Sequence, residues 1–166
     1  MLGGFTSELE TIFISIKGQY TDSMLEYREF AAQVENLPHI YDFLADELVK
    51  SELHDSLGFD LKIAVEELFT NICKYSSTDQ LAGCVSIRIT IDTESVQVEM
   101  IDDGHPFNPW ESDDPNLDLS PEEREIGGLG IFLVKQLMDR VSYRRAENKN
   151  ISTICKNLPC LNGDKE

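Results

Sequence analysis

The chain has 166 residues, 41% of them hydrophobic and 27% charged, which is the composition of one globular domain with a core of its own. Its 31 acidic residues against 14 basic ones give a formal net charge of −17, which repels nucleic acids and anionic membranes and favours protein partners with basic patches. The sequence contains neither an apolar run of the roughly 20 residues that a membrane helix needs nor the basic-then-apolar start of a secretion signal. We therefore expect a cytoplasmic protein.

The cysteines are expected to be reduced thiols in that compartment. No two of them form a CxxC pair and no histidine cluster accompanies them, so the pattern argues against a zinc site. Two of the four, Cys73 and Cys155, are expected to fill the core. The others are Cys84 and Cys160.

Two strands and a helix are predicted in the first third of the chain. Isoleucines alternate with other residues over Leu9–Lys17, which is typical of a strand, and Glu26–Val34 is a second, weaker strand pattern. Residues 1–25 are expected to form an N-terminal extension that adds an edge strand or a dimer contact. A helix is predicted over about Asn36–Leu53, with Asn36 as a candidate N-cap and Gly58 as a break after it.

The stretch Leu61–Tyr75 is predicted to be the central helix, because its apolar residues recur at helical spacing with no Gly or Pro inside. Glu67, Asn71 and Lys74 form a narrow polar stripe beside the apolar face, since they lie at i, i+4 and i+7. On the floor of a cleft, the Asn71 oxygen could hold a metal ion and Glu67 could act as a general base. The alternative is the solvated rim of an ordinary core helix.

An antiparallel hairpin is predicted next, from the alternation of apolar residues in Val85–Ile91 and Val96–Met100. Continuing the second strand by two residues puts Asp102 on the core-facing side, where a carboxylate without a partner costs stability. Gly104 follows, where the backbone can turn sharply or approach a ligand closely. Asp102 is therefore a candidate ligand-binding residue, or else it begins a turn and accepts hydrogen bonds from its own backbone.

The long acidic connection Asn108–Glu125 is predicted to be a lid or binding loop, or a solvated loop without a role. Gly127, Gly128 and Gly130 then open a helix predicted over Ile131–Val141. Glycines at a helix start free backbone amides at the positive end of the helix dipole, which suits phosphate. They could instead only permit close packing.

The chain is predicted to end in a second hairpin. Its strands are Tyr143–Ala146 and Ile151–Leu158, its turn is Glu147–Asn150, and a frayed tail follows over 161–166.

Three segments, in this order, resemble the motifs of GHKL-type ATPases, the Bergerat fold. EELFTN is similar to the N box of that family, IDDGHPF to its first glycine box and GGLGIFLVKQLMDRVSY to its second. The resemblance runs from about Tyr27 to Leu158. In detail, the motif sequences most resemble those of stand-alone bacterial anti-sigma-factor serine kinases. It implies an α/β fold of two layers (α+β), with a mostly antiparallel sheet covered on one face by helices. The ATPase domain would span residues 26–160, with a lid over 108–126.

The resemblance also implies a role for each matching residue. Glu67 corresponds to the general base and Asn71 to the residue that binds a magnesium ion on the triphosphate. Asp102 corresponds to the carboxylate that accepts the adenine amino group, with Gly104 beneath the base. Further nucleotide contacts are implied for Lys74, Arg124, Gly128, Leu129, Gly130 and Thr153; Gly128 and Gly130 are the lid hinge, Arg124 contacts phosphate or a partner, and Thr153 lies near adenine.

The implied function is that of an ATP-dependent protein serine/threonine kinase that uses Mg²⁺. It would phosphorylate an anti-anti-sigma (STAS-type) partner and regulate a sigma factor, without direct contact to nucleic acid or membrane. Relatives of this kind are often homodimers. Two alternatives remain: a switch that binds ATP and a protein partner but transfers nothing, and an ATPase coupled to a larger machine.

Overall fold

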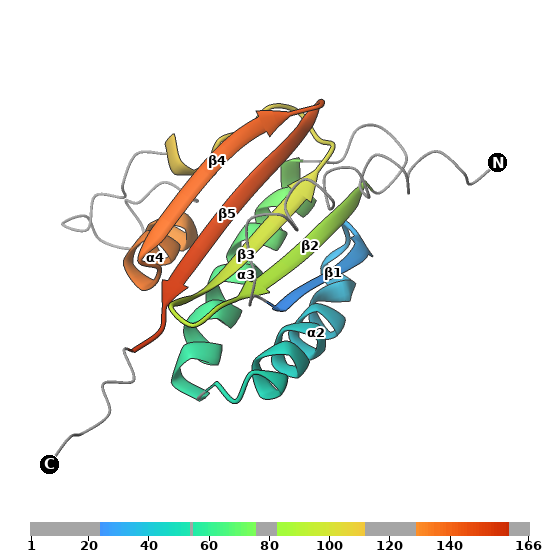
Figure 1. Ribbon diagram of the computed structural model, residues 1–166. Coiled ribbons are helices and arrows are strands. Elements are labelled where there is room, and N and C mark those ends of the chain that lie inside the picture. Colours follow the sequence, from blue (N-terminus) through green and yellow to red (C-terminus); the bar gives the residue numbers. More distant parts are fainter. Residues whose placement is uncertain (1–23, 54, 76–82, 112–128, 160–166) are drawn as a thin grey trace, which may run out of the picture.

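The structure is a computed structural model that describes residues 24–53, 55–75, 83–111 and 129–159. This part of the chain forms one sheet and one layer of helices (Figure 1). The predicted strand Leu9–Lys17, most of the predicted lid and the C-terminal tail lie outside the described residues.

The sheet has five strands, all antiparallel to their neighbours, in the order β1-β2-β3-β5-β4. Both predicted hairpins are confirmed, and their registers place alternate residues of each strand on the helix side. The strands are β1 (Met24–Ala31), β2 (Cys84–Ile91), β3 (Ser95–Asp102), β4 (Arg140–Ala146) and β5 (Lys149–Asn157).

Three helices cover one face of this sheet, which confirms the predicted two-layer α+β architecture (Figure 1). The central helix runs behind β3 and β5 and contacts both of the other helices. The helices are α2 (Leu37–Lys50), α3 (Asp55–Tyr75) and α4 (Leu129–Leu137), with short 3-10 turns at η1 (Val34–Asn36) and η2 (Pro109–Glu111).

The core fills the space between the two layers. Leu61 and Phe69 of α3 are completely buried, and Ile87, Met100 and Ile154 meet them from three neighbouring strands. Burial of the apolar face of α3 explains why this helix was predicted correctly, since most helical stability comes from such packing. Cys155 is buried and Cys73 half-buried, both as free thiols.

Two predicted helix ends are wrong, and one predicted cap lacks its side-chain bond. Gly58 does not break the chain but lies inside α3, which begins at Asp55, because packing of the helix outweighs the low helix propensity of one glycine. Asn36 lies at the N-cap position of α2 as predicted, but its side chain makes no capping bond, since its amide donates to the Ala31 carbonyl at 2.9 Å. The last helix stops at Leu137, and Val141 belongs to β4, where pairing with β5 satisfies its backbone.

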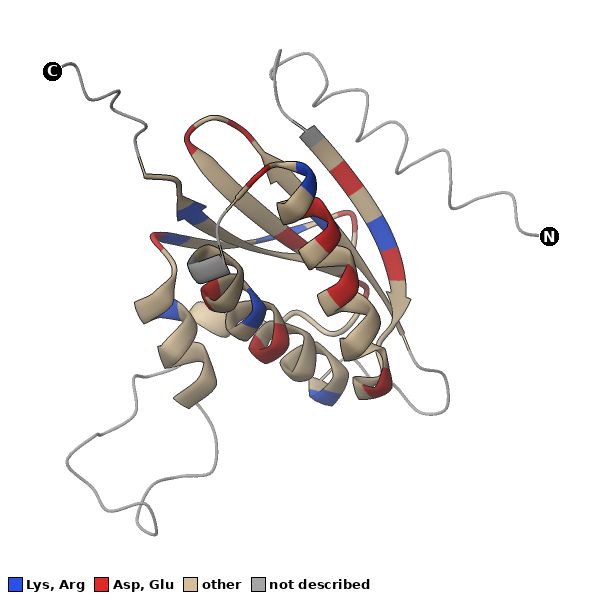
Figure 2. Cartoon of the chain, turned by 90° about the horizontal axis from the view of Figure 1, so that it is seen from below, with Lys and Arg blue, Asp and Glu red and all other residues tan. Residues whose placement is uncertain are grey.

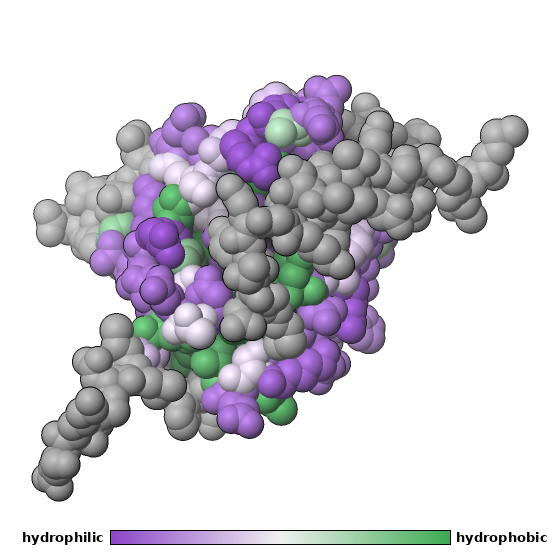
Figure 3. Space-filling model, in the orientation of Figure 1, coloured by the Kyte–Doolittle hydropathy of each residue, from purple (hydrophilic) through white to green (hydrophobic). Residues whose placement is uncertain are grey.

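Acidic residues outnumber basic ones along α2 and α3, so the helix layer contributes to the acidic surface (Figure 2). On the side seen in Figure 3, hydrophilic residues make up most of the described surface and apolar residues lie in small, separate patches. Within the described ranges, no helix is both long enough and apolar enough to cross a membrane.

Candidate functional site

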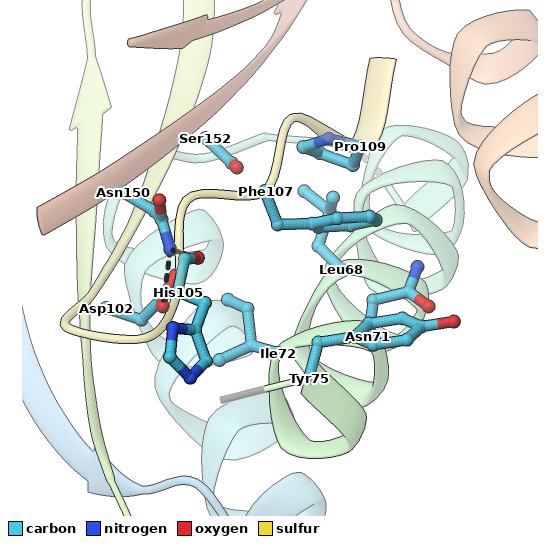
Figure 4. A pocket seen from close by; sticks show the side chains of 10 residues that line it. All are labelled: Leu68, Asn71, Ile72, Tyr75, Asp102, His105, Phe107, Pro109, Asn150 and Ser152. Atoms are coloured by element: carbon cyan, nitrogen blue, oxygen red, sulfur yellow. Dashed lines mark hydrogen bonds between the residues drawn. The ribbon is translucent and has the colours of Figure 1, made fainter. Parts of the chain in front are cut away.

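A small pocket opens between the C-terminal half of α3, the loop after β3 and the start of β5 (Figure 4). It brings together Asn71 and Asp102, two predicted site residues that lie on different elements. Its volume is about 20 Å³, room for about one water molecule. The lining residues are Leu68, Asn71, Ile72, Tyr75, Asp102, His105, Phe107, Pro109, Asn150 and Ser152.

Asp102 is the last residue of β3 and is only 5% exposed, on the helix side of the sheet as strand parity predicted. Its Oδ1 accepts two hydrogen bonds of 2.9 Å, from the backbone amide of Gly104 and from the side-chain amide of Asn150. The turn predicted for Asp102 is therefore confirmed, and Asn150 is a distant partner for the buried carboxylate; the ligand-binding role of Asp102 stays a prediction. Neither of these two hydrogen bonds uses Oδ2. Burial raises the pKa of Asp102, and the two hydrogen bonds act to lower it.

Asn150 is the central residue of a buried polar network around Asp102. Its amide group donates to Asp102 and to the carbonyl of His105, the latter at 2.9 Å. Its Oδ1 accepts from the Tyr143 hydroxyl at 2.8 Å and from Arg145 Nη1 at 2.6 Å. Every hydrogen-bonding position of the Asn150 amide is thus used, which fixes the side chain in one orientation and holds the Asp102 carboxylate in place.

The sequence analysis missed Asn150 because it assigned this residue to the last turn. The turn consists of Glu147 and Asn148 alone, with φ values of 49° and 63°, as in a two-residue hairpin connection. Asn150 therefore already belongs to β5. The signal that could have found it is the alternation Asn150, Ser152, Ile154, in which all three residues are buried.

Glu67 and Asn71 lie one turn apart on α3, both half-buried, but they face different neighbours. Asn71 lines the pocket, whereas the Glu67 carboxyl lies against Gly130 at the start of α4, so closely that a side chain at Gly130 would overlap it. The structure therefore places the predicted base beside the second glycine motif. Lys74, on the same stripe, is exposed.

Two aromatic side chains that the sequence analysis did not assign to the site stack beside the pocket (Figure 4). The rings of Tyr75 and Phe107 lie 4.9 Å apart between centroids at an interplanar angle of 29°. This contact joins the end of α3 to the loop after β3, and both residues line the pocket.

The remaining predicted residues are placed as follows. Thr153 lies opposite Glu99 and Ser142 in the sheet, on the face away from Asp102, so the β5 hydroxyl in the pocket is that of Ser152 and the prediction for Thr153 is corrected. Leu129 is half-exposed at the start of α4. Arg124, Gly127 and Gly128 lie outside the described residues.

The two-layer fold is that of a histidine kinase-like ATPase domain. The family model described as "Histidine kinase-like ATPase domain" matches residues 30–156, and the chain belongs to this family.

Curated relatives carry a more particular name. The chain is 33% identical over 113 residues to a protein of Bacillus subtilis named "Serine-protein kinase RsbW", covering 64% of this chain and 66% of that protein. It is 35% identical over 92 residues to the protein of the same name from Bacillus velezensis, covering 51% of this chain and 56% of the relative. The Listeria monocytogenes protein is 34% identical over 96 residues, which cover 55% and 61% of the two chains.

These matches span less than two thirds of the length of each relative. Among solved structures, the RsbU and RsbW domains of a Mycobacterium tuberculosis protein share the fold, with a TM-score of 0.58 at 12% identity. That match covers 82% of this chain and 33% of the other.

Proposed function

We propose that this chain is an ATP-dependent serine/threonine protein kinase that phosphorylates a STAS-type anti-anti-sigma protein and thereby regulates a sigma factor. The observation that carries the proposal is the arrangement of three motifs around one end of α3. Asp102 and Asn71 line one pocket, and Glu67 lies one turn from Asn71 against Gly130. Relatives named serine-protein kinase support the choice of acceptor. The proposed domain, residues 26–160, contains the matched region 30–156.

Asp102 is proposed to recognise adenine through Oδ2. The exocyclic amino group of adenine is a hydrogen-bond donor, and a carboxylate oxygen accepts such a bond more strongly than a neutral group does. Guanine presents a carbonyl oxygen at the corresponding position, which the carboxylate repels. The pocket must widen to take a purine, since its present volume is that of about one water molecule.

Asn71 is proposed to hold Mg²⁺ through its side-chain oxygen. An amide oxygen is a hard ligand that suits this ion, which is usually held by few protein groups plus phosphates and water. Within the part of the chain that the structure describes, no group of three or more His, Cys, Asp or Glu could hold a metal ion. The amide oxygen of Asn71 fits an ion whose other ligands are phosphate oxygens and water. When bound, the ion would offset phosphate charge in a strongly acidic protein.

Glu67 is proposed to act as the general base. Its carboxylate would accept the proton of the acceptor serine as the serine oxygen bonds to the γ-phosphorus and the bond from that phosphorus to the ADP oxygen breaks. Such transfer depends mainly on positioning, so the packing of the Glu67 carboxyl against Gly130 of α4 supports this role.

The test is incubation of the protein with the STAS protein of the same organism, Mg²⁺ and ATP labelled at the γ-phosphate. We expect label on a serine of the STAS protein with the parent and its loss with Glu67→Gln. Glu66→Gln is the matched control, because Glu66 is the adjacent residue but is exposed and bonded to the Tyr41 hydroxyl at 2.6 Å. ATP binding without transfer by the parent would favour the non-catalytic switch, and steady ATP turnover without any partner would favour the ATPase.

A further inference from the structure

The contact between Glu67 and Gly130 joins the two helices that border the phosphate side of the proposed site. Gly130 is the second residue of α4, which packs against α3 (Figure 1). A Cβ built on Gly130 would lie 2.5 Å from Cδ of Glu67 and would overlap Oε2, whereas Cγ, at 3.2 Å, would have to give by only a few tenths of an ångström. The overlap is therefore confined to the carboxyl group, the part of Glu67 that carries the proposed chemistry.

We propose that Gly130 is a positioning residue for Glu67: its missing side chain is what allows the carboxylate to occupy its place between α3 and α4. This inference rests on the proposed function, in which Glu67 is the base. It assigns Gly130 a role distinct from a backbone contact to phosphate. Since the carboxyl is the far end of a flexible side chain, an added methyl group displaces it by rotation and leaves the fold intact.

The described part of the chain offers a matched glycine. Gly58 also lies in a helix, in the first turn of α3, but a Cβ there would meet only Leu48 Cδ1 at 3.4 Å, an ordinary van der Waals contact. Gly58→Ala and Gly130→Ala are thus the same chemical change, but only Gly130→Ala displaces a carboxylate. Each should gain helix propensity equally.

The first experiment is single-turnover phosphotransfer to the STAS protein at saturating ATP, with ATP affinity measured separately. Gly130→Ala should lower the transfer rate about a hundredfold, as misplacing a catalytic group by about 1 Å does, while ATP affinity stays within about twofold of the parent. Gly58→Ala should change neither. In the Glu67→Gln background, Gly130→Ala should have no further effect on the residual rate. A full rate with Gly130→Ala, or a loss that appears only as weaker ATP binding, would overturn the inference.

The second experiment tests the contact between Gly130 and Glu67 by a measurement that does not depend on kinase activity. In thermal unfolding, Gly130→Ala should raise the melting temperature more in a Glu67→Ala background than in the parent, because the overlap exists only with glutamate present. Gly58→Ala should give equal shifts in both backgrounds. Equal shifts for Gly130→Ala would refute the contact. If the parent transfers no phosphate, the proposed function fails, and this thermal cycle still decides whether Gly130 positions Glu67.

Discussion

Replacing Asn150 by alanine tests whether the network behind the pocket holds Asp102 for its ligand. The change removes four hydrogen bonds at once, to Asp102, His105, Tyr143 and Arg145. At about 1 kcal/mol net for each bond, and with water entering the space to satisfy some of the groups left behind, we expect a loss of about 3 kcal/mol. For a chain of this size that corresponds to a fall in melting temperature of about 6–12 °C. Tyr143→Phe removes one bond and should cost about 1 kcal/mol.

The assay is calorimetric titration of ATP with Mg²⁺, below the melting temperature of the variant. Asp102 keeps the Gly104 amide but loses its second donor, so its carboxylate can rotate, and we expect ATP to bind about tenfold more weakly, or about 1.4 kcal/mol. Asn157→Ala is the control, because this residue lies at the exposed end of the same strand and bonds Asp139 through its backbone amide. A destabilised Asn150→Ala protein with parental ATP affinity would refute the reasoning.

Four further predictions concern Asp102, Lys156 and Tyr75. ATP affinity should fall on acidification at a pH above the ordinary range of an aspartate, because burial raises the pKa of Asp102 and only the carboxylate accepts well. ATP affinity measured from pH 4 to 7 should show a midpoint in the parent that is absent from Asp102→Asn. An ATP affinity of the parent that does not change with pH would contradict this prediction. Because the pKa of Asp102 is higher in the folded state, this carboxyl stabilises the fold most below its ordinary pKa, and the contribution is lost as the pH rises through the raised value. In unfolding measurements at pH 7, Asp102→Asn should therefore be at least as stable as the parent. Lys156→Met should lower the free energy of unfolding, measured by urea titration, by about 1–2 kcal/mol. The reason is that the Lys156 amine contacts Asp60 at 3.0 Å and a carbonyl in the last turn of α4 at 2.5 Å. An unchanged urea midpoint would show that these contacts contribute nothing. Tyr75→Ala should speed ATP association in stopped-flow mixing by removing the stack with Phe107, and an unchanged rate would mean that this stack does not limit access.

Much of the fold was predictable because periodicity reports burial directly. The hairpin of β2 and β3 and the helix α3 each follow from a strict apolar pattern, and the parity of β3 put Asp102 on the correct face. The motifs then located Glu67 and Asn71. These predictions depend only on the spacing of residues that are close in the chain, and the sequence shows that spacing directly.

What failed to follow from the sequence depends on register and on contacts between elements. A two-residue turn instead of a four-residue one moves Asn150 from a loop into the site, and a shift of one residue exchanges Thr153 for Ser152 in the pocket. The packing of Gly130 on Glu67 requires the positions of two helices at once. No spacing along the chain encodes that distance.

The most direct test of the account is calorimetric titration of ATP, in the presence of Mg²⁺, into the parent and into Asp102→Asn. The variant keeps the size of the side chain and the acceptor for Gly104 and Asn150, but turns the oxygen proposed to face adenine into a donor. Loss of a hydrogen bond to a charged group, about 1.5–3 kcal/mol, predicts affinity about 10- to 150-fold weaker. Asp103→Asn, at the exposed neighbouring residue, should bind as the parent does. Equal affinity of the parent and Asp102→Asn would contradict the assignment of this pocket to adenine.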